Sequence, residues 1–537
     1  MRGADVLVQA LATAGTTKIF SLSGNQIMPV YDACIDAGIE IIHTRHEAAA
    51  VFMAEAWAQV TGQIGVALVT AAPGFGNALG PLYSARASES PLLLLTGDAP
   101  VALDGKGGFQ ELAQVEITRP LTKASLRALS AERIGDDAAR LIEIAKSGRP
   151  GPVHMALPFD VLETQVAAGT LRPDADAFRD QADLAVSDLT LIQTALEKAE
   201  RPLILTGPCL NPSRAGDLLS RLADAAGAPV VPMESPRGLN DPALGDLRQV
   251  FEKADVIVSL GKPIDFMLSF GDEAIFKSCR SWLVVDAEQQ ALDRAEHNLE
   301  SRLTSAFLAN PRRIAESLTG QLKAADSRSS WRQEVTTLIS ARGFRLDETA
   351  ESGAISSAVL CAAVQKEVEK SPHSIVICDG GEFGQWAQAI TKGERRIING
   401  PGGAIGGGLC YGIGAKKACP EAQVVALMGD GTVGFHFAEF ETAVRENTPF
   451  VVIVGNDRRW NAEHQIQLRA YGEERLIGCG LSDARYDLAA AGLGAHGEYV
   501  RDLSELDDAL TRAFRSGKPA CVNVEIEGLA APGGVSH

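Results

Sequence analysis

An aspartate stands inside a glycine turn in the last third of the sequence. The motif GDGTVG at residues 429–434 follows the apolar run 424–428, and Asn456 and Asp457 end the next apolar run. Apolar runs that flank a helical pattern predict parallel strands joined by a right-handed crossover. Because neighbouring strands lie about 4.8 Å apart, Asp430 and Asp457 are expected to face one common site.

Three interpretations fit this turn. G-x-G-x-x-G after a strand, with an acid ending the next strand, is also the dinucleotide-binding fingerprint, in which Asp457 would bind a ribose. Asp430 could also simply cap a helix. In the third interpretation a divalent cation lies between the carboxylate and a bound diphosphate, because Mg²⁺ prefers oxygen ligands and often shares carboxylates with phosphates. The dinucleotide interpretation gives Asp430 no role, so we favour the metal–diphosphate site.

A second acid opens the alanine-rich stretch EAAAVFMAEAWAQVTG at Glu47. One interpretation is that Glu47 merely compensates the dipole of the helix that it begins. Its apolar neighbours also suit an acid–base role, which requires a carboxyl group shielded from water.

The elements that must position these acids follow one pattern throughout. Each third of the chain alternates helical patterns with apolar runs that end in Gly or Asp, such as IGVALVTA, ADVIVSLG and SIVICDGG. Runs that are apolar throughout predict parallel strands buried on both faces. We therefore predict an α/β chain of three doubly wound parallel-sheet domains, with ligands at the carboxyl ends of the strands.

Two polar stretches, 167–188 and 322–335, are predicted as linkers, and the second leads through a helical stretch to residue 345. The predicted domains are residues 1–166, 189–321 and 350–537.

Composition excludes several classes of protein. The 537-residue chain has a net charge of −18, which argues against a nucleic-acid partner. Its nine cysteines include no C-x-x-C pair, which favours free thiols in a reducing compartment. We find no signal-peptide pattern and no apolar segment long enough for a membrane, so we expect a cytoplasmic protein without a membrane partner.

The GDG turn, the following helical pattern and the pair Asn456-Asp457 resemble the thiamin-diphosphate motif of the acetolactate synthase superfamily. The resemblance covers essentially the whole chain and implies a pyrimidine-binding, a central and a diphosphate-binding domain. It implies Mg²⁺ bound by the side chains of Asp430 and Asp457 and the carbonyl of Arg459. The family usually has Asn-Asn at 456–457, so this site carries one more negative charge.

The resemblance also assigns the remaining cofactor contacts. Glu47 in RHE matches the acid that protonates the pyrimidine ring, and Gln110 in FQE matches a glutamine that points into the active site. Ile405 matches the bulky residue that bends the cofactor. The other expected cofactor-binding residues are Pro73, Asn77, Gly381, Glu382, Gly429, Gly431 and Asn456.

The substrate pocket is implied by two loops. Asn25 and Gln26 occupy a loop where several relatives place a catalytic histidine, which this chain lacks. Ala462 and Glu463 follow the metal ligands and should border the thiazolium, with Glu463 either an added proton donor or a solvent-facing residue. Other stretches resemble different relatives: TRHEAAA resembles benzaldehyde lyase, GKPIDFMLSFG 2-hydroxyacyl-CoA lyase, and GNQIMPVYDA acetolactate synthase.

The resemblance thus implies a thiamin-diphosphate- and Mg²⁺-dependent lyase or carboligase acting next to a carbonyl, on 2-oxo acids, acyloins or 2-hydroxyacyl thioesters. GKPIDFMLSFG lacks the arginine-rich continuation of flavin-binding synthases, which argues against FAD and leaves ADP and CoA open. Active sites of the family form between subunits, so a homodimer or homotetramer is implied. Two alternatives stay open: an NAD(P)-linked oxidoreductase using residues 429–434, and an inactive thiamin-diphosphate-binding regulatory homologue.

Overall fold

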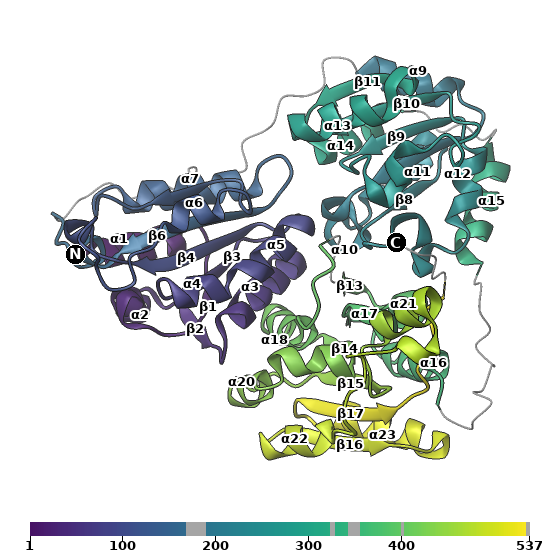
Figure 1. The fold of residues 1–537 in the computed structure, drawn as a ribbon. Coiled ribbons are helices and arrows are strands. Elements are labelled where there is room, and N and C mark those ends of the chain that lie inside the picture. Colours follow the sequence, from purple (N-terminus) through teal and green to yellow (C-terminus); the bar gives the residue numbers. More distant parts are fainter. Residues whose placement is uncertain (168–188, 323–327, 342–354, 399–401, 533–537) are drawn as a thin grey trace.

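The computed structural model of the chain describes residues 1–167, 189–322, 328–341, 355–398 and 402–532, which form three parallel sheets in succession (Figure 1). Every registered strand pair is parallel. The predicted fold class, α/β with three doubly wound parallel sheets, is confirmed.

The first sheet has the order β2-β1-β3-β4-β6-β5. Its strands are β1 Lys18–Ser21, β2 Glu40–His43, β3 Gly65–Val69, β4 Leu92–Asp98, β5 Ser125–Arg127 and β6 Pro152–Pro158. Its helices are α1 Gly3–Thr13, α2 Met28–Ala37, α3 Glu47–Thr61, α4 Pro73–Asn77, α5 Leu79–Ala87, α6 Gln114–Thr118, α7 Ile134–Lys146 and α8 Phe159–Glu163. One apolar core joins α1, α2 and α7 to the sheet, and a second joins α3 and α5, so helices cover both faces.

The central sheet has the order β11-β10-β9-β7-β8. Its strands are β7 Pro202–Thr206, β8 Val230–Pro232, β9 Val256–Leu260, β10 Ser281–Asp286 and β11 Leu303–Leu308. Around it lie α9 Leu189–Lys198, α10 Pro212–Ala215, α11 Leu218–Ala226, α12 Leu247–Lys253, α13 Gln289–Leu299, α14 Pro311–Gln321 and α15 Ser329–Ser340.

The third sheet, β13-β12-β14-β15-β17-β16, repeats the strand order of the first. Its strands are β12 Ser374–Cys378, β13 Arg395–Ile398, β14 Gln423–Gly429, β15 Val451–Asn456, β16 His496–Val500 and β17 Ala520–Glu525. Its helices are α16 Ser357–Val368, α17 Gly381–Ile390, α18 Gly408–Ala418, α19 Asp430–Val433, α20 Glu439–Arg445, α21 Asn461–Tyr471, α22 Tyr486–Gly492 and α23 Leu503–Arg515. Strand order reverses between β1 and β3 and between β12 and β14, where ligands of such sheets bind.

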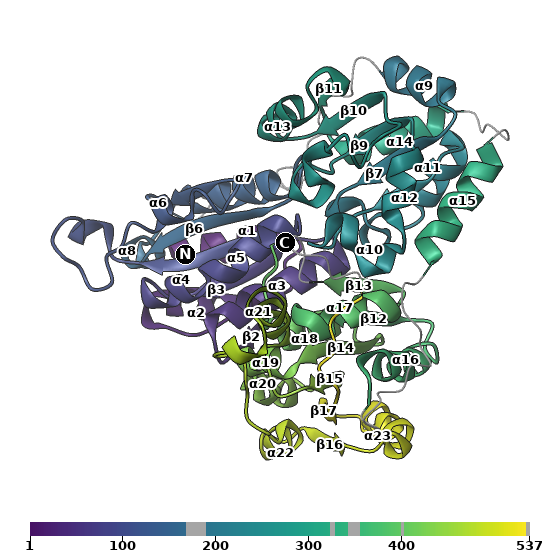
Figure 2. The same ribbon diagram turned by 45° about the vertical axis from the view of Figure 1, so that its right-hand side comes forward.

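The first and third domains share one apolar core through α3 and α18, which lie side by side in both views (Figure 1 and Figure 2). Close approach depends on Gly414 of α18, because a Cβ there would lie 2.4 Å from the carbonyl oxygen of Met53. The interface also buries Glu55, whose Oε2 accepts a 2.9 Å hydrogen bond from the hydroxyl of Tyr411.

Two local expectations need correction. The segment between β14 and β15 is not one helix but α19, a 3₁₀ turn at Gly434–His436 and α20. Phe440 is buried in the core, whereas Phe435 is 54% exposed and packs against Trp460. The aromatic residues of this segment therefore do not share one face. The predicted linker 322–335 is partly helical, because α15 begins at Ser329 and buries Trp331 in the central core.

Most of the linker predicted at 167–188 lies outside the described residues, as does residue 350, and the domain limits 1–166, 189–321 and 350–537 stay predictions. All nine cysteines lie among the described residues as free thiols. Within the described part of the chain, none of the helices combines the length and apolarity needed to cross a membrane.

Candidate active site

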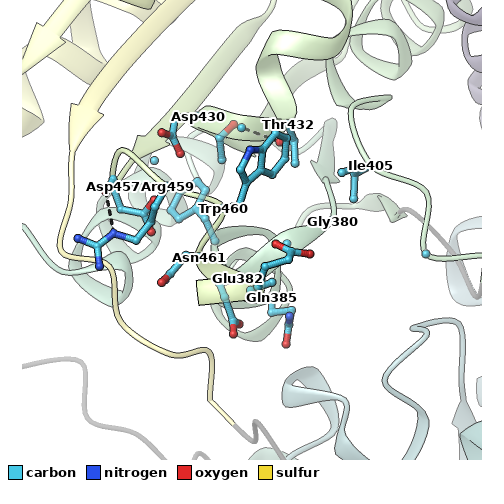
Figure 3. Close-up of a pocket in the computed structure, with 18 of the residues that line it drawn as sticks. Gly380, Glu382, Gln385, Ile405, Asp430, Thr432, Asp457, Arg459, Trp460 and Asn461 are labelled. Atoms are coloured by element: carbon cyan, nitrogen blue, oxygen red, sulfur yellow. Dashed lines mark hydrogen bonds between the residues drawn. The ribbon is translucent and has the colours of Figure 1, made fainter. Parts of the chain in front are cut away.

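A cavity of 390 Å³ opens at the carboxyl ends of β12, β14 and β15, where the strand order of the third sheet reverses (Figure 3). Most of its wall comes from the third domain. The central domain adds Pro236, Arg237 and Phe266. Phe266 belongs to the stretch GKPIDFMLSFG, whereas no motif in the sequence marks Pro236 or Arg237. The predicted residues on its wall are Gly381, Glu382, Ile405, Gly429, Asp430, Gly431, Asp457, Arg459, Ala462 and Glu463.

Asp430 and Asp457 meet at one end of this cavity. Asp430 is the first residue of α19 and Asp457 directly follows β15, and the strands before them pair in register at Gly429 and Gly455. Both side chains are buried, with exposed fractions of 2% and 7%. Burial, together with repulsion from Asp457, raises the pKa of Asp430 to about 7, and burial raises the pKa of Asp457 to about 6.

This acidic pair meets the requirements of a cation site. The Oδ2 atom of Asp430 is buried and has no hydrogen-bond partner, although a buried acceptor normally has one. A divalent cation would satisfy this oxygen and remove the repulsion between the two carboxylates. The described residues contain no group of three or more His, Cys, Asp or Glu side chains that could hold a metal. The remaining ligands would therefore be main-chain or cofactor oxygens, which suits Mg²⁺.

Arg459 lies directly behind the acidic pair. Its Nε donates to the carbonyl oxygen of Asp457 at 3.2 Å, and its Nη1 lies 3.3 Å from Nε2 of His464. These contacts fix the turn after β15, and Arg459 lines the cavity.

Two glycine segments shape the opposite part of the cavity. Gly381 opens α17 with a left-handed backbone (φ 84°), and its neighbour Gly380 packs so closely that a Cβ would lie 2.5 Å from Cγ2 of Ile405. Asp379 fixes both segments, because its carboxylate accepts hydrogen bonds from the main-chain N–H groups of Gly380 at 2.6 Å, Gly406 at 3.0 Å and Gly408 at 3.1 Å. Figure 3 shows Ile405 across the cavity from Asp430 and Asp457. Asp379 was not predicted, although an acid that ends a buried strand is the same signal that identified Asp430.

The start of α21 forms the rim. The ring of Trp460 lies against Gly431, where a Cβ would come within 2.7 Å of Cε3, and meets Phe435 edge-on with ring centroids 6.2 Å apart. The carboxylate of Glu382, on α17, accepts a 3.2 Å hydrogen bond from the N–H of Ala531, and burial raises its pKa. Glu463 is exposed to solvent where it lines the cavity.

Asn456 is placed differently from the expectation. It does not line the cavity; its Nδ2 instead donates to Oδ1 of Asn523 at 3.1 Å, inside the sheet. Its Oδ1 accepts a 3.2 Å hydrogen bond from the N–H of Arg458, whose backbone is left-handed (φ 58°). Asn456 therefore holds the turn that carries Asp457.

A second group of predicted residues gathers in the first domain. Glu47 begins α3, as expected, and its Oε2 accepts a 2.9 Å hydrogen bond from Nδ2 of Asn77. Pro73 begins α4 beside it, and a Cβ on Gly74 would lie 3.2 Å from Oε1 of Glu47. The carboxylate is thus held between α3 and α4, and is buried.

Gln26 and Gln110 are also brought together, with Gln26 Nε2 2.5 Å from Gln110 Oε1, while Asn25 is exposed next to them. None of these first-domain residues reaches the cavity: among the described residues, those that line it begin at Pro236. Within one chain the predicted site is therefore divided into two groups, one in each outer domain.

Comparison with known proteins agrees with this division. Residues 1–117 match the family model "Thiamine pyrophosphate enzyme, N-terminal TPP binding domain", and residues 379–524 match "Thiamine pyrophosphate enzyme, C-terminal TPP binding domain". The chain is 32% identical to the "Probable acetolactate synthase" of Mycobacterium bovis, over 98% of this chain and 95% of that protein. It is 31% identical to "2-hydroxyacyl-CoA lyase 2" of Homo sapiens (98% and 90%) and 26% identical to "2-hydroxyacyl-CoA lyase" of Arabidopsis thaliana (98% and 96%).

Proposed function

We propose, from the premise that this chain belongs to the thiamine pyrophosphate enzyme family, that it is a Mg²⁺-dependent enzyme that breaks or forms a carbon–carbon bond next to a carbonyl. The observation that carries the proposal is the buried pair Asp430 and Asp457, in which one carboxylate oxygen has no partner. A dinucleotide in this turn would place its pyrophosphate against Asp430 without a cation between them, so we do not favour the oxidoreductase alternative.

In this proposal the side chains of Asp430 and Asp457 and the carbonyl of Arg459 hold Mg²⁺. The main chain at Gly381 and Glu382 and the turn at residues 429–431 bind the diphosphate, because glycine lets a ligand approach the backbone closely. Ile405, across the cavity from the two aspartates, would support the bound cofactor. When bound, thiamin diphosphate supplies a nucleophilic carbon and an electron sink for C–C chemistry.

Glu47 holds a proton at a ring nitrogen of the aminopyrimidine. The carboxyl group is oriented by Asn77 and shielded by α3 and α4, which suits a group that must exchange a proton with one ligand atom rather than with water. Retention of this acid is the reason that we favour an active enzyme over an inactive regulatory homologue.

The two groups of residues lie in different domains, which supports a homodimer or homotetramer in which the first domain of one subunit completes the cavity of another. The substrates we propose are 2-oxo acids, acyloins or 2-hydroxyacyl thioesters, because the relatives include proteins named acetolactate synthase and 2-hydroxyacyl-CoA lyase. Gln110 and Glu463 would contact the substrate, with Asn25, Gln26 and Ala462 around it. We do not propose FAD; ADP or CoA could bind. The free thiols favour the cytoplasm.

The first test is a binding titration followed by a substrate screen. Trp460 lines the cavity, so thiamin diphosphate is expected to change the tryptophan fluorescence only when Mg²⁺ is present, and Trp460→Phe should remove most of that signal. Pyruvate, glyoxylate, benzoin and a 2-hydroxyacyl-CoA would then be offered in turn, with products separated by chromatography. Tight binding without Mg²⁺, or NAD(P) binding with no thiamin diphosphate binding, would overturn the proposal.

A further inference from the structure

The first sheet has its own strand-order reversal, between β1 and β3, and polar side chains gather there. Gln26 lies in the 3₁₀ turn Asn25–Ile27 that follows β1, and Thr70 directly follows β3. The two strands are hydrogen-bonded neighbours, so their carboxyl ends bring these residues to one place. The two sheets have the same strand order, in which β3 corresponds to β14. Thr70 after β3 therefore corresponds to the position of Asp430 after β14.

Three side chains form a hydrogen-bonded series at this place. The hydroxyl of Thr70 donates to Oε1 of Gln26 at 2.7 Å, and Nε2 of Gln26 donates to Oε1 of Gln110 at 2.5 Å. Gln26 is only 5% exposed, whereas Gln110 is half-buried. The series therefore runs from the interior toward an accessible amide.

Two glycines leave room for this series. A Cβ on Gly97 of β4 would lie 2.8 Å from Cβ of Gln26, and a Cβ on Gly24 would lie 2.4 Å from Cβ of Thr70. Gln110 itself has a left-handed backbone (φ 61°), which a side chain of its type rarely adopts. Such backbone conformations persist where surrounding contacts hold the residue in place. Here the side chain of Gln26 contacts the side chain of Gln110.

The order of donors fixes the direction of the last amide. Because the Thr70 hydroxyl donates to the oxygen of Gln26, the nitrogen of Gln26 faces Gln110 and the oxygen of Gln110 is used. What remains at the end of the series is Nε2 of Gln110, which carries hydrogens and can only donate.

We infer that Gln26 is a positioning residue that holds Gln110 as a hydrogen-bond donor toward the oxygen of the substrate carbonyl. The identity of that oxygen rests on the proposed function; the positioning of Gln110 does not. A donor fixed in advance at an oxygen that gains negative charge stabilises the transition state more than the ground state. The hydroxyl of Thr70 acts one step further back, by fixing the amide of Gln26.

Four variants test this inference. Gln26→Leu removes the amide at similar size, Gln26→Glu replaces its donor by an acceptor, and Thr70→Val removes the hydroxyl. Gln63→Leu, at an exposed position of the same domain, is the matched control. A crystal structure of the Gln26→Leu protein is expected to show the Gln110 side chain displaced from its wild-type position. An unchanged Gln110 in that structure would overturn the inference.

Kinetics give the second readout. We expect Gln26→Leu to lower kcat at least tenfold, Gln26→Glu to lower it further, and Thr70→Val to lower it less, with thiamin diphosphate affinity within twofold of wild type. In a Gln110→Ala background, Gln26→Leu should change kcat less than twofold, because there is no amide left to position. Effects that multiply would overturn the inference. If the wild type shows no thiamin-dependent turnover, the proposed function fails instead, and the crystal structure alone decides the positioning role.

Discussion

The side-chain amide of Asn77 donates a 2.9 Å hydrogen bond to the carboxylate of Glu47, linking the first turn of α3 to the end of α4. The second carboxylate oxygen lies over Gly74, where any larger residue would crowd it. The acid is therefore held in one orientation by the protein itself, before any ligand binds.

Replacing Glu47 by Gln keeps the shape of the side chain and removes its acid. We expect kcat to fall by about 10²–10⁴-fold, the usual contribution of a positioned acid or base, while thiamin diphosphate still binds. Steady-state rates and a fluorescence titration measure the two quantities separately. Glu163→Gln, on the surface of the same domain, should change neither. Equal loss of binding and turnover would mean that Glu47 is structural.

The two aspartates are expected to differ in whether Mg²⁺ still binds when the residue is replaced by asparagine. Asp457→Asn gives the pair of amides usual in the resembling family, so Mg²⁺ should still raise the melting temperature in the presence of thiamin diphosphate, by mass action on the folded state. Asp430→Asn should abolish that rise. Without Mg²⁺, either variant should be more stable than wild type by about 1 kcal/mol, because one buried charge is removed. Differential scanning calorimetry measures both effects, and lower stability of both apo variants would contradict the acidic-pair interpretation.

His154 in β6 should make the protein less stable in acid. Its ring is fully buried and contacts the hydroxyl groups of Thr96 at 2.9 Å and Ser125 at 2.8 Å, and burial lowers its pKa from 6.5 to about 3. Because the unfolded chain binds the proton more tightly, the stabilisation is complete above pH 6.5 and is lost as pH falls toward 3.

Between pH 7 and pH 5 this histidine should cost the folded state about 2 kcal/mol. Urea unfolding of wild type and His154→Gln at both pH values isolates the effect, since other titrating groups are common to both proteins. The variant is expected to be less stable at pH 7 but less sensitive to acid. The same pH dependence in both proteins would show that His154 is not the cause.

Gly414 tests the contact between α3 and α18. Ala at this position would place a methyl group against the carbonyl oxygen of Met53, so we expect a loss of about 1–3 kcal/mol in the free energy of unfolding. Gly320, near the end of α14, has open space around its Cα, and Gly320→Ala should stabilise the helix by up to about 1 kcal/mol. Opposite signs in chemical denaturation would confirm that close packing, not helix propensity, decides at Gly414.

The sequence was sufficient for features that depend on local patterns. Uniformly apolar runs identified the parallel strands, and the acid after β14 identified Asp430, because strand ends and helix starts are encoded within a few residues. The helix after Asp430 was less well predicted, because Phe435 packs on Trp460 rather than in the core. Phe435 has the spacing of a core-facing helix residue, but its packing against Trp460 is a tertiary contact that the spacing alone does not predict.

Contacts between distant segments could not be predicted from pattern. Pro236 and Arg237 reach the cavity from the central domain, and no motif marks them as members of a site in the third. The resemblance placed Gln26 and Gln110 in one pocket, but their direct hydrogen bond joins residues that are 84 positions apart, which no local pattern reports. Likewise, Asn456 follows the expected strand, yet Asn523 determines where its side chain points.

The shared core of α3 and α18 also has a consequence for synthesis. Glu55 and Tyr411, which meet in that core, are 356 positions apart along the chain. At about 5–20 residues per second, the ribosome needs roughly 20–70 s to make the intervening segment. During that time the first domain has emerged with the alanine-rich face of α3 still uncovered. The growing chain thus exposes the apolar face of α3 long before α18, which buries that face, is made. Depletion of chaperones should therefore lower the yield of the full chain more than the yield of a chain truncated before α3.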